Sequence, residues 1–209
     1  MPRKFNINTQ HDALEFFDSI LDSLRYEFEL INQLEIFEKY FGFELETKRT
    51  CQNCFFIRSE TLNHFSLLLN MIDETCTLNV LLENFFEEKY VPDFKCTCGN
   101  FGLLEATSFR NLPKFLNIKI SRFTNQLTKI MAYLKYEENI IIMDMPYALT
   151  GVLIHQGNSI QCGHYYSYLN LERRWFKVND SVIEETSFKK LIESEEATCM
   201  LVYEQISRY

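Results

Sequence analysis

Glycine, proline and tryptophan are scarce in this sequence of 209 residues, which contains 6 Gly, 4 Pro and 1 Trp. So few glycines and prolines exclude a collagen-like or low-complexity chain. Basic residues are also few, because 21 Lys and Arg face 29 Asp and Glu, which gives a net charge of −8. This balance argues against a non-specific nucleic-acid binder, whose affinity comes from cationic contacts with phosphates.

Long hydrophobic runs are missing as well. The longest stretch without Asp, Glu, Lys or Arg covers residues 145–171, and its two histidines and several amides make it unsuitable as a membrane span. The first twelve residues are polar, and no apolar segment of the kind found in secretory signals follows them. We therefore expect no membrane partner and a cytoplasmic and/or nuclear location.

Apolar residues are plentiful, at 46% of the chain with 15% aromatic, so one domain with a sizeable core is expected. Helical spacing of apolar residues predicts a helix over residues 13–31, with Thr9 as its cap and Asp12 in the capping-box position. A second helix is expected over residues 78–89. The stripe of the first helix consists of Ala13, Phe16, Phe17, Ile20, Leu21, Leu24, Phe28 and Ile31.

The pattern changes after residue 105, where Leu116, Ile118 and Ile120 alternate with polar residues, as is typical of a strand. A polar turn at residues 172–174 predicts an antiparallel hairpin, and a short helix is expected over residues 188–193. Early helices followed by antiparallel strands indicate the α+β class. Further strands are expected over residues 139–143, 147–155, 164–171, 175–178 and 198–203.

Two cysteine pairs, Cys51 with Cys54 and Cys96 with Cys98, are separated by about 40 residues. This spacing is typical of a structural zinc site, in which each of two hairpin knuckles supplies two thiolates. Residues two apart on a strand point to the same face, so the closely spaced second pair can chelate. The alternative is four ordinary reduced cysteines.

His164 lies at the start of one expected strand, and Asn179 and Asp180 follow the next one. Such residues can meet across a hairpin as the base and orienting group of a catalytic triad. The alternative is a histidine satisfied within a sheet and an acid in a turn. By themselves, the polar residues at the start of the first helix are better explained by capping and solvation than by chemistry. The segment after His155 is likewise better explained as a strand end with a glycine turn.

Taken together, these stretches resemble the catalytic domain of the ubiquitin-specific proteases, cysteine peptidases that remove ubiquitin. The resemblance extends over nearly the whole chain. The matching stretches are QHDALEFF at 10–17, Phe41-Gly42 through CQNC at 51–54, the Leu-Pro to Arg-Phe strand at 112–123, YALTGVLIHQG at 147–157, GHYYSYL at 163–169, WFKVNDSVIEE at 175–185 and TCMLVYEQ at 198–205.

The resemblance implies a papain-like fold of the thumb–palm–fingers type. It divides a single domain into the remainder of the thumb at residues 1–40, the fingers with a zinc site at 41–105, and the palm with the histidine box at 106–209. It also implies ubiquitin or ubiquitinated proteins as partners and hydrolysis of the bond after the C-terminal glycine of ubiquitin.

Residue by residue, the resemblance implies that His164 is the general base, Asn179 the third triad member and Asp180 an assisting acid. It gives the four paired cysteines as the ligands of a structural zinc ion. It further implies that ubiquitin contacts six residues near the helix start and the histidine box. These are Gln10, Asp12, Glu15, His155, Gly163 and Tyr165.

One feature of the family is missing from the sequence. Members carry a cysteine box, an Asn followed closely by Gly-x-Thr-Cys, well before the position of Gln10, and the nine residues before Gln10 contain no cysteine. Cys162 lies too close to His164 in sequence for in-line attack on a carbonyl. A base without its thiol has no proton to take, so we expect the chain as given to be inactive alone.

Three interpretations stay open at this point. The chain is a protease domain whose cysteine box lies upstream of this sequence, or a catalytically inactive ubiquitin-binding or scaffold protein on the same fold. The third is an unrelated zinc-stabilised intracellular domain.

Overall fold

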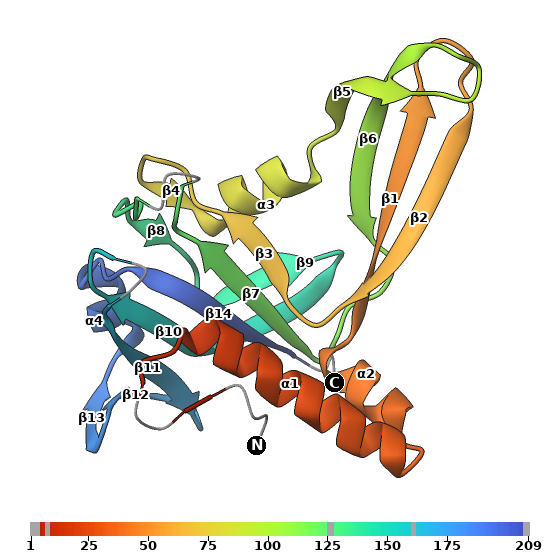
Figure 1. Ribbon diagram of the computed structural model, residues 1–209. Coiled ribbons are helices and arrows are strands. Elements are labelled where there is room, and N and C mark those ends of the chain that lie inside the picture. The colour runs from red at the N-terminus through yellow and green to blue at the C-terminus, as the bar shows by residue number, and fades with distance from the viewer. Residues whose placement is uncertain (1–4, 7–8, 125–127, 160–161, 207–209) are drawn as a thin grey trace.

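The computed structural model describes residues 5–6, 9–124, 128–159 and 162–206. Two large sheets dominate it, and the smaller of them projects away from the rest of the molecule (Figure 1). The long first helix lies beside the larger sheet, at the opposite end from the projecting tip (Figure 1). None of the described helices is long and apolar enough to cross a membrane.

Four helices are described. They are α1 (Ala13–Leu30), α2 (Leu34–Phe41), α3 (Leu78–Phe86) and α4 (Phe188–Glu193). The predictions of α1 and α4 are confirmed, whereas α2 was not predicted. The second predicted helix ends earlier than expected, because Glu87 has an extended ψ of 135° and the chain enters a strand at Lys89.

The cap of α1 corrects the prediction from sequence. Asp12, rather than Thr9, is the N-cap: its backbone is extended and its carboxylate accepts a hydrogen bond from the Glu15 amide. Thr9 is three residues too early to reach an unpaired amide of the helix. Its hydroxyl instead donates to the Asn6 carbonyl at 3.2 Å and contacts the His11 ring nitrogen Nε2 at 2.8 Å.

The projecting sheet has the order β2-β1-β6-β5 and is antiparallel throughout. Most side chains of its outer strands β2 and β5 are exposed, and ion pairs of Arg49 with Glu105 at 2.7 Å and with Glu60 at 3.1 Å connect neighbouring strands. Cross-strand pairs of this kind compensate for a thin apolar core. The strands are β1 (Phe43–Cys51), β2 (Ile57–His64), β5 (Lys89–Lys95) and β6 (Phe101–Phe109).

The larger sheet has eight strands in the order β13-β12-β11-β10-β14-β7-β3, with β9 paired to one end of β10. Every pairing is antiparallel except that of β3 with β7. All the strands predicted after residue 105 are confirmed. The strands are β3 (Leu67–Asn70), β7 (Phe115–Ser121), β9 (Asn139–Ile142), β10 (Met145–Gln156), β11 (His164–Leu171), β12 (Arg174–Asn179), β13 (Val182–Thr186) and β14 (Thr198–Gln205).

The core lies against both faces of β7. Leu116, Ile118 and Ile120 are buried, and the intervening Asn117 and Lys119 are buried too. The Asn117 amide donates to the Phe65 carbonyl, and the Lys119 ammonium pairs with Asp18 of α1. Both polar groups are therefore satisfied, as burial requires.

Two connections within the fold differ in length, and the shorter of them, between β11 and β12, brings the ends of these strands together. The β11–β12 turn is formed by Glu172 and Arg173, both with positive φ, so the predicted hairpin is confirmed and has a type I′ turn. After β2 the chain leaves the projecting sheet and enters the larger sheet as β3. It continues through β4 (Cys76–Thr77), which pairs with β8 (Leu134–Lys135), and then forms α3. The division of the chain at residues 40 and 105 stays a prediction.

Candidate functional site

A histidine and an asparagine meet where the β11–β12 hairpin opens. His164 is the first residue of β11 and Asn179 the last of β12, and His164 Nε2 lies 2.5 Å from Asn179 Oδ1. The amide oxygen can only accept, so Nε2 carries the proton and Nδ1 keeps a free lone pair. The imidazole is thus held in the tautomer that can take a proton from a neighbouring group.

Asp180 lies at the same end of the hairpin but farther away. Its Oδ2 is 3.9 Å from His164 Nε2, and its side chain is 80% exposed. A left-handed φ of 51° at Asp180 turns the chain toward β13. In this geometry the amide, and not the carboxylate, is within hydrogen-bonding distance of the ring.

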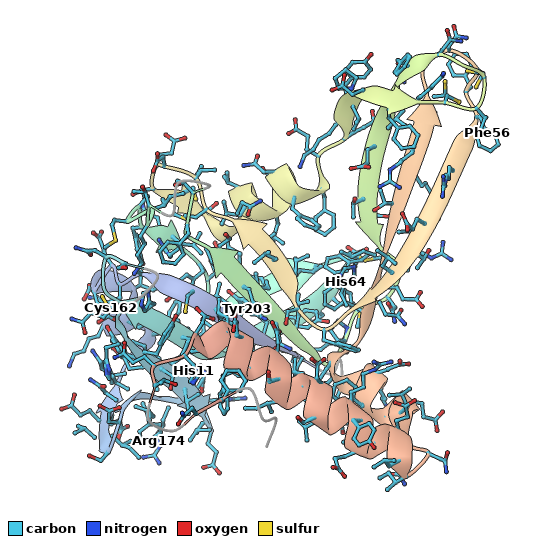
Figure 2. The ribbon with its side chains drawn as sticks, in the orientation of Figure 1. His11, Phe56, His64, Cys162, Arg174 and Tyr203 are labelled. Carbon is cyan, nitrogen blue, oxygen red and sulfur yellow. The ribbon has the colours of Figure 1, made fainter. Side chains whose placement is uncertain are left out.

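A pocket of about 390 Å³ adjoins this end of the sheet. Two of its lining residues, His11 and Cys162, are labelled in Figure 2, which shows them on the same side of the molecule near the start of α1. Five of the six residues for which a ubiquitin contact was predicted line this pocket, and Glu15 does not. The full lining is Gln10, His11, Asp12, His155, Cys162, Gly163 and Tyr165.

Asp12 joins the helix start to the sheet within this pocket. One oxygen of its carboxylate caps α1, and the other accepts a hydrogen bond of 2.9 Å from the Tyr165 hydroxyl. Burial, and then the nearby Asp12, raise the pKa of Tyr165, so its hydroxyl keeps the proton that it donates. The ring of Tyr165 stacks on His155 with 4.5 Å between centroids.

Glycine is required at position 163 because the His155 ring packs directly against the backbone there. A Cβ at this position would lie 2.0 Å from His155 Nε2, closer than any real contact. The absent side chain therefore lets His155 lie against the residue that precedes His164.

Three residues of this region were missed by the sequence predictions: His11, which lines the pocket, Lys129 and Cys162. Lys129 is 7% exposed, and its ammonium contacts the ring of His155 and two backbone carbonyls. Cys162 was considered only as a nucleophile, and it forms part of the pocket wall. Nothing in the sequence around Lys129 distinguishes it from an exposed loop lysine, because its partners lie far along the chain.

The four paired cysteines come together at the tip of the projecting sheet, where Figure 2 labels Phe56. Their sulfur atoms all lie within 4.8 Å of one another, with Cys51 and Cys98 3.8 Å apart and Cys54 and Cys96 3.7 Å apart. Four sulfurs at about 2.3 Å from a tetrahedral metal ion would be about 3.8 Å apart, so the set could hold one ion. Hydrogen bonds from the backbone and side chain of Asn100 lower the pKa of Cys98 to about 6, whereas the pKa of the neighbouring Cys54 is raised to about 12, so the shifts do not favour the thiolate at every ligand position.

Helices beside an antiparallel sheet, a projecting four-stranded sheet, and a histidine oriented by an asparagine define the papain-like cysteine peptidase fold of the thumb–palm–fingers type. The family model described as ubiquitin carboxyl-terminal hydrolase matches residues 1–203. The chain belongs to the ubiquitin carboxyl-terminal hydrolase family.

Individual proteins agree with this family. The chain is 24% identical to ubiquitin carboxyl-terminal hydrolase 11 of Schizosaccharomyces pombe, over 98% of this chain and 64% of that protein. It is 24% identical to ubiquitin carboxyl-terminal hydrolase 8 of Saccharomyces cerevisiae, over 90% of this chain and 48% of that protein. The chain thus spans about half to two thirds of the length of these relatives.

Solved structures share the fold. A SAGA deubiquitinating module that contains a singly substituted Ubp8 matches 97% of this chain and 52% of its own chain, with a TM-score of 0.85 and 21% identity. A second such module, with a different Ubp8 variant and bound to monoubiquitin, matches 96% of this chain and 50% of its own, with a TM-score of 0.84 and 20% identity.

Proposed function

We propose that this chain is a deubiquitinase domain whose site cleaves the bond after the C-terminal glycine of ubiquitin by thiol-dependent hydrolysis. The observation that supports this most directly is the contact of 2.5 Å between His164 Nε2 and Asn179 Oδ1 in a chain of this family. In the proposal His164 is the general base, because its free Nδ1 takes the proton from a thiol.

Asn179 is the orienting residue in this proposal. It holds the imidazole in one tautomer and stabilises the imidazolium that forms after proton transfer. Asp180, at 3.9 Å, assists by its negative charge rather than by a hydrogen bond. The thiol is expected from the cysteine box that the family resemblance places before Gln10.

The proposed ligand of the pocket is the tail of ubiquitin. Gln10, Asp12, His155, Gly163 and Tyr165 offer an amide, a carboxylate, an imidazole, bare backbone and a phenol ring, which together suit an extended peptide. Glu15, on the first turn of α1, is proposed to contact ubiquitin outside the pocket. The fold neighbours that were solved with monoubiquitin and with ubiquitin aldehyde support ubiquitin as the partner.

The metal proposed for the four cysteines at the tip is a structural zinc ion, because four thiolates at tetrahedral spacing are its usual ligands. We assign this region to the fingers within residues 41–105, the thumb to residues 1–40 and the palm to residues 106–209. None of the seven cysteines, all of which the structure describes, is in a disulfide, which fits a reducing compartment and hence the cytosol or nucleus.

Binding can be tested with the chain itself. Titration calorimetry should show heat with ubiquitin and at least tenfold weaker binding with ubiquitin that lacks its last two residues. Asp12→Ala should weaken binding of the intact form, whereas Asp22→Ala, on an exposed part of the same helix, should not. Absence of heat at millimolar ubiquitin would refute the binding part of the proposal.

Catalysis has a separate test. An in-frame Asn-x-Gly-x-Thr-Cys box upstream of the Met1 codon in the gene would support the hydrolase, and an in-frame stop codon close upstream would contradict it. In the second case, binding of ubiquitin without hydrolysis would identify a scaffold protein on the same fold.

A further inference from the structure

Lys129 is a buried lysine that no carboxylate among the described residues neutralises. Its ammonium lies 2.8 Å from the His155 carbonyl, 2.6 Å from the Gly157 carbonyl and 3.1 Å from His155 Nδ1. These three acceptors match the three N–H donors of an ammonium group. Burying a charge without a counter-ion is costly, so a merely space-filling role would be served better by an apolar side chain.

The contact with His155 determines which nitrogen of that ring carries the proton. An ammonium has no acceptor, so Nδ1 must accept and the proton of the neutral ring must be on Nε2. Burial, followed by the charge of Lys129, lowers the pKa of His155, which keeps the ring neutral. Nε2 is also the atom that lies against Gly163, the residue directly before His164.

The same ring continues the connection to the helix start. His155 stacks on Tyr165, whose hydroxyl donates to Asp12, and Asp12 caps α1. Lys129 itself follows Thr124 and Thr128, which are joined by a backbone hydrogen bond of 3.0 Å. Lys129 therefore contacts His155 and Gly157 directly, at the end of β10. Through the His155 ring it is connected to Gly163, Tyr165 and Asp12, which line the pocket.

We infer that Lys129 is a positioning residue, which holds His155 in the Nε2–H tautomer against Gly163 and thereby fixes the pocket wall and the start of the strand that carries His164. This inference rests on the proposed function, because it treats the pocket as the site for the ubiquitin tail. Lys129 contacts no ligand in this account and acts through His155.

The test compares two buried lysines. Lys129→Met keeps the length of the side chain and removes the three donors. Lys119→Met removes an equally buried ammonium, but one that binds Asp18 and the Leu14 carbonyl of α1 rather than His155. Long-range proton–nitrogen NMR reports the tautomer of each histidine, and His155→Gln identifies the signals of His155. Calorimetry gives the affinity for ubiquitin.

In the unchanged chain His155 should be a single Nε2–H tautomer. Lys129→Met should convert it to a mixture with the Nδ1–H form and weaken ubiquitin binding on the order of tenfold, the loss of about one hydrogen-bonded support. Lys119→Met should lower the melting temperature and leave both readouts unchanged. Lys129→Arg, which keeps the charge and the donors, should restore part of the affinity.

Either of two results would overturn the inference: an unchanged His155 tautomer in Lys129→Met, or a changed tautomer with unchanged affinity. If the unchanged chain binds no ubiquitin, the proposed function fails. The tautomer then still decides whether Lys129 holds His155, so the two failures can be told apart.

Discussion

Replacement of Asp12 by alanine should remove two interactions at once. One carboxylate oxygen accepts the Glu15 amide at 2.9 Å and the other accepts the Tyr165 hydroxyl at 2.9 Å. Loss of an N-cap costs about 1 kcal/mol, and loss of a hydrogen bond to a charged group costs about 1.5 kcal/mol. We therefore expect Asp12→Ala to lower the free energy of unfolding by about 2.5 kcal/mol.

Urea denaturation followed by circular dichroism measures this change, and a double-mutant cycle with Tyr165→Phe separates its parts. Tyr165→Phe keeps the cap and should cost about 1.5 kcal/mol. The double variant should cost little more than Asp12→Ala alone, because both changes remove the same hydrogen bond. Asp22→Ala, at an exposed position of α1, should stay within about 0.5 kcal/mol of the unchanged chain.

Two results would refute this reasoning. A loss below about 0.5 kcal/mol for Asp12→Ala would mean that water replaces both contacts. Losses that simply add in the double variant would mean that Tyr165 and Asp12 do not interact.

Three further predictions follow from the site. Gly163→Ala places a Cβ 2.0 Å from His155 Nε2 and should lower the free energy of unfolding, measured by thermal unfolding, by roughly 2–4 kcal/mol. The control Gly151→Ala, whose added Cβ would have its nearest atom at 3.6 Å, should lower it by under about 1 kcal/mol. Equal losses would contradict the close approach of His155 to Gly163. Elemental analysis should find one zinc ion per chain. The zinc should be lost in a double variant with Cys51→Ser and Cys54→Ser, and it should be retained in Cys76→Ser. Zinc retained by the double variant would exclude the four-thiol site. In ubiquitin hydrolysis by the native gene product, Asn179→Ala should lower kcat by at least tenfold and Asp180→Asn should lower it by less. The reason is that, of the two residues, only Asn179 is within hydrogen-bonding distance of His164. A larger loss of kcat in Asp180→Asn would make Asp180 the orienting residue.

The sequence was informative where an element is half-buried and its partners are close in the chain. Strands β10, β11 and β12 alternate well enough to be found, and the turn between β11 and β12 has only two residues, Glu172 and Arg173. This local hairpin is also what brings His164 and Asn179 together, which is why the site geometry could be predicted. The cysteine cluster was found from spacing alone.

The missed features have a common physical cause. The outer strands β2 and β5 of the projecting sheet are largely exposed on both faces, and the inner strands β1 and β6 are partly buried without a regular alternation of apolar residues. These four strands therefore gave no periodic signal. Lys129 binds carbonyls 26 and 28 residues away, and only the folded chain brings them together. Asp12 caps α1 because helix formation starts three residues later than the capping pattern suggested.

The projecting sheet is built from two pairs of strands that are far apart in the sequence, β1 with β2 and β5 with β6, and this has a consequence for the order of folding. Its inner strands β1 and β6 pair residues about 60 positions apart, as between Thr47 and Thr107. The hairpins of the larger sheet close much shorter loops and are expected to form first, because loop closure is slower and entropically more costly for distant partners. The sulfur atoms in contact at the tip belong to residues 42 and 47 positions apart in the sequence. A metal ion bound there would therefore bind late in folding and would hold the second pair of strands against the first.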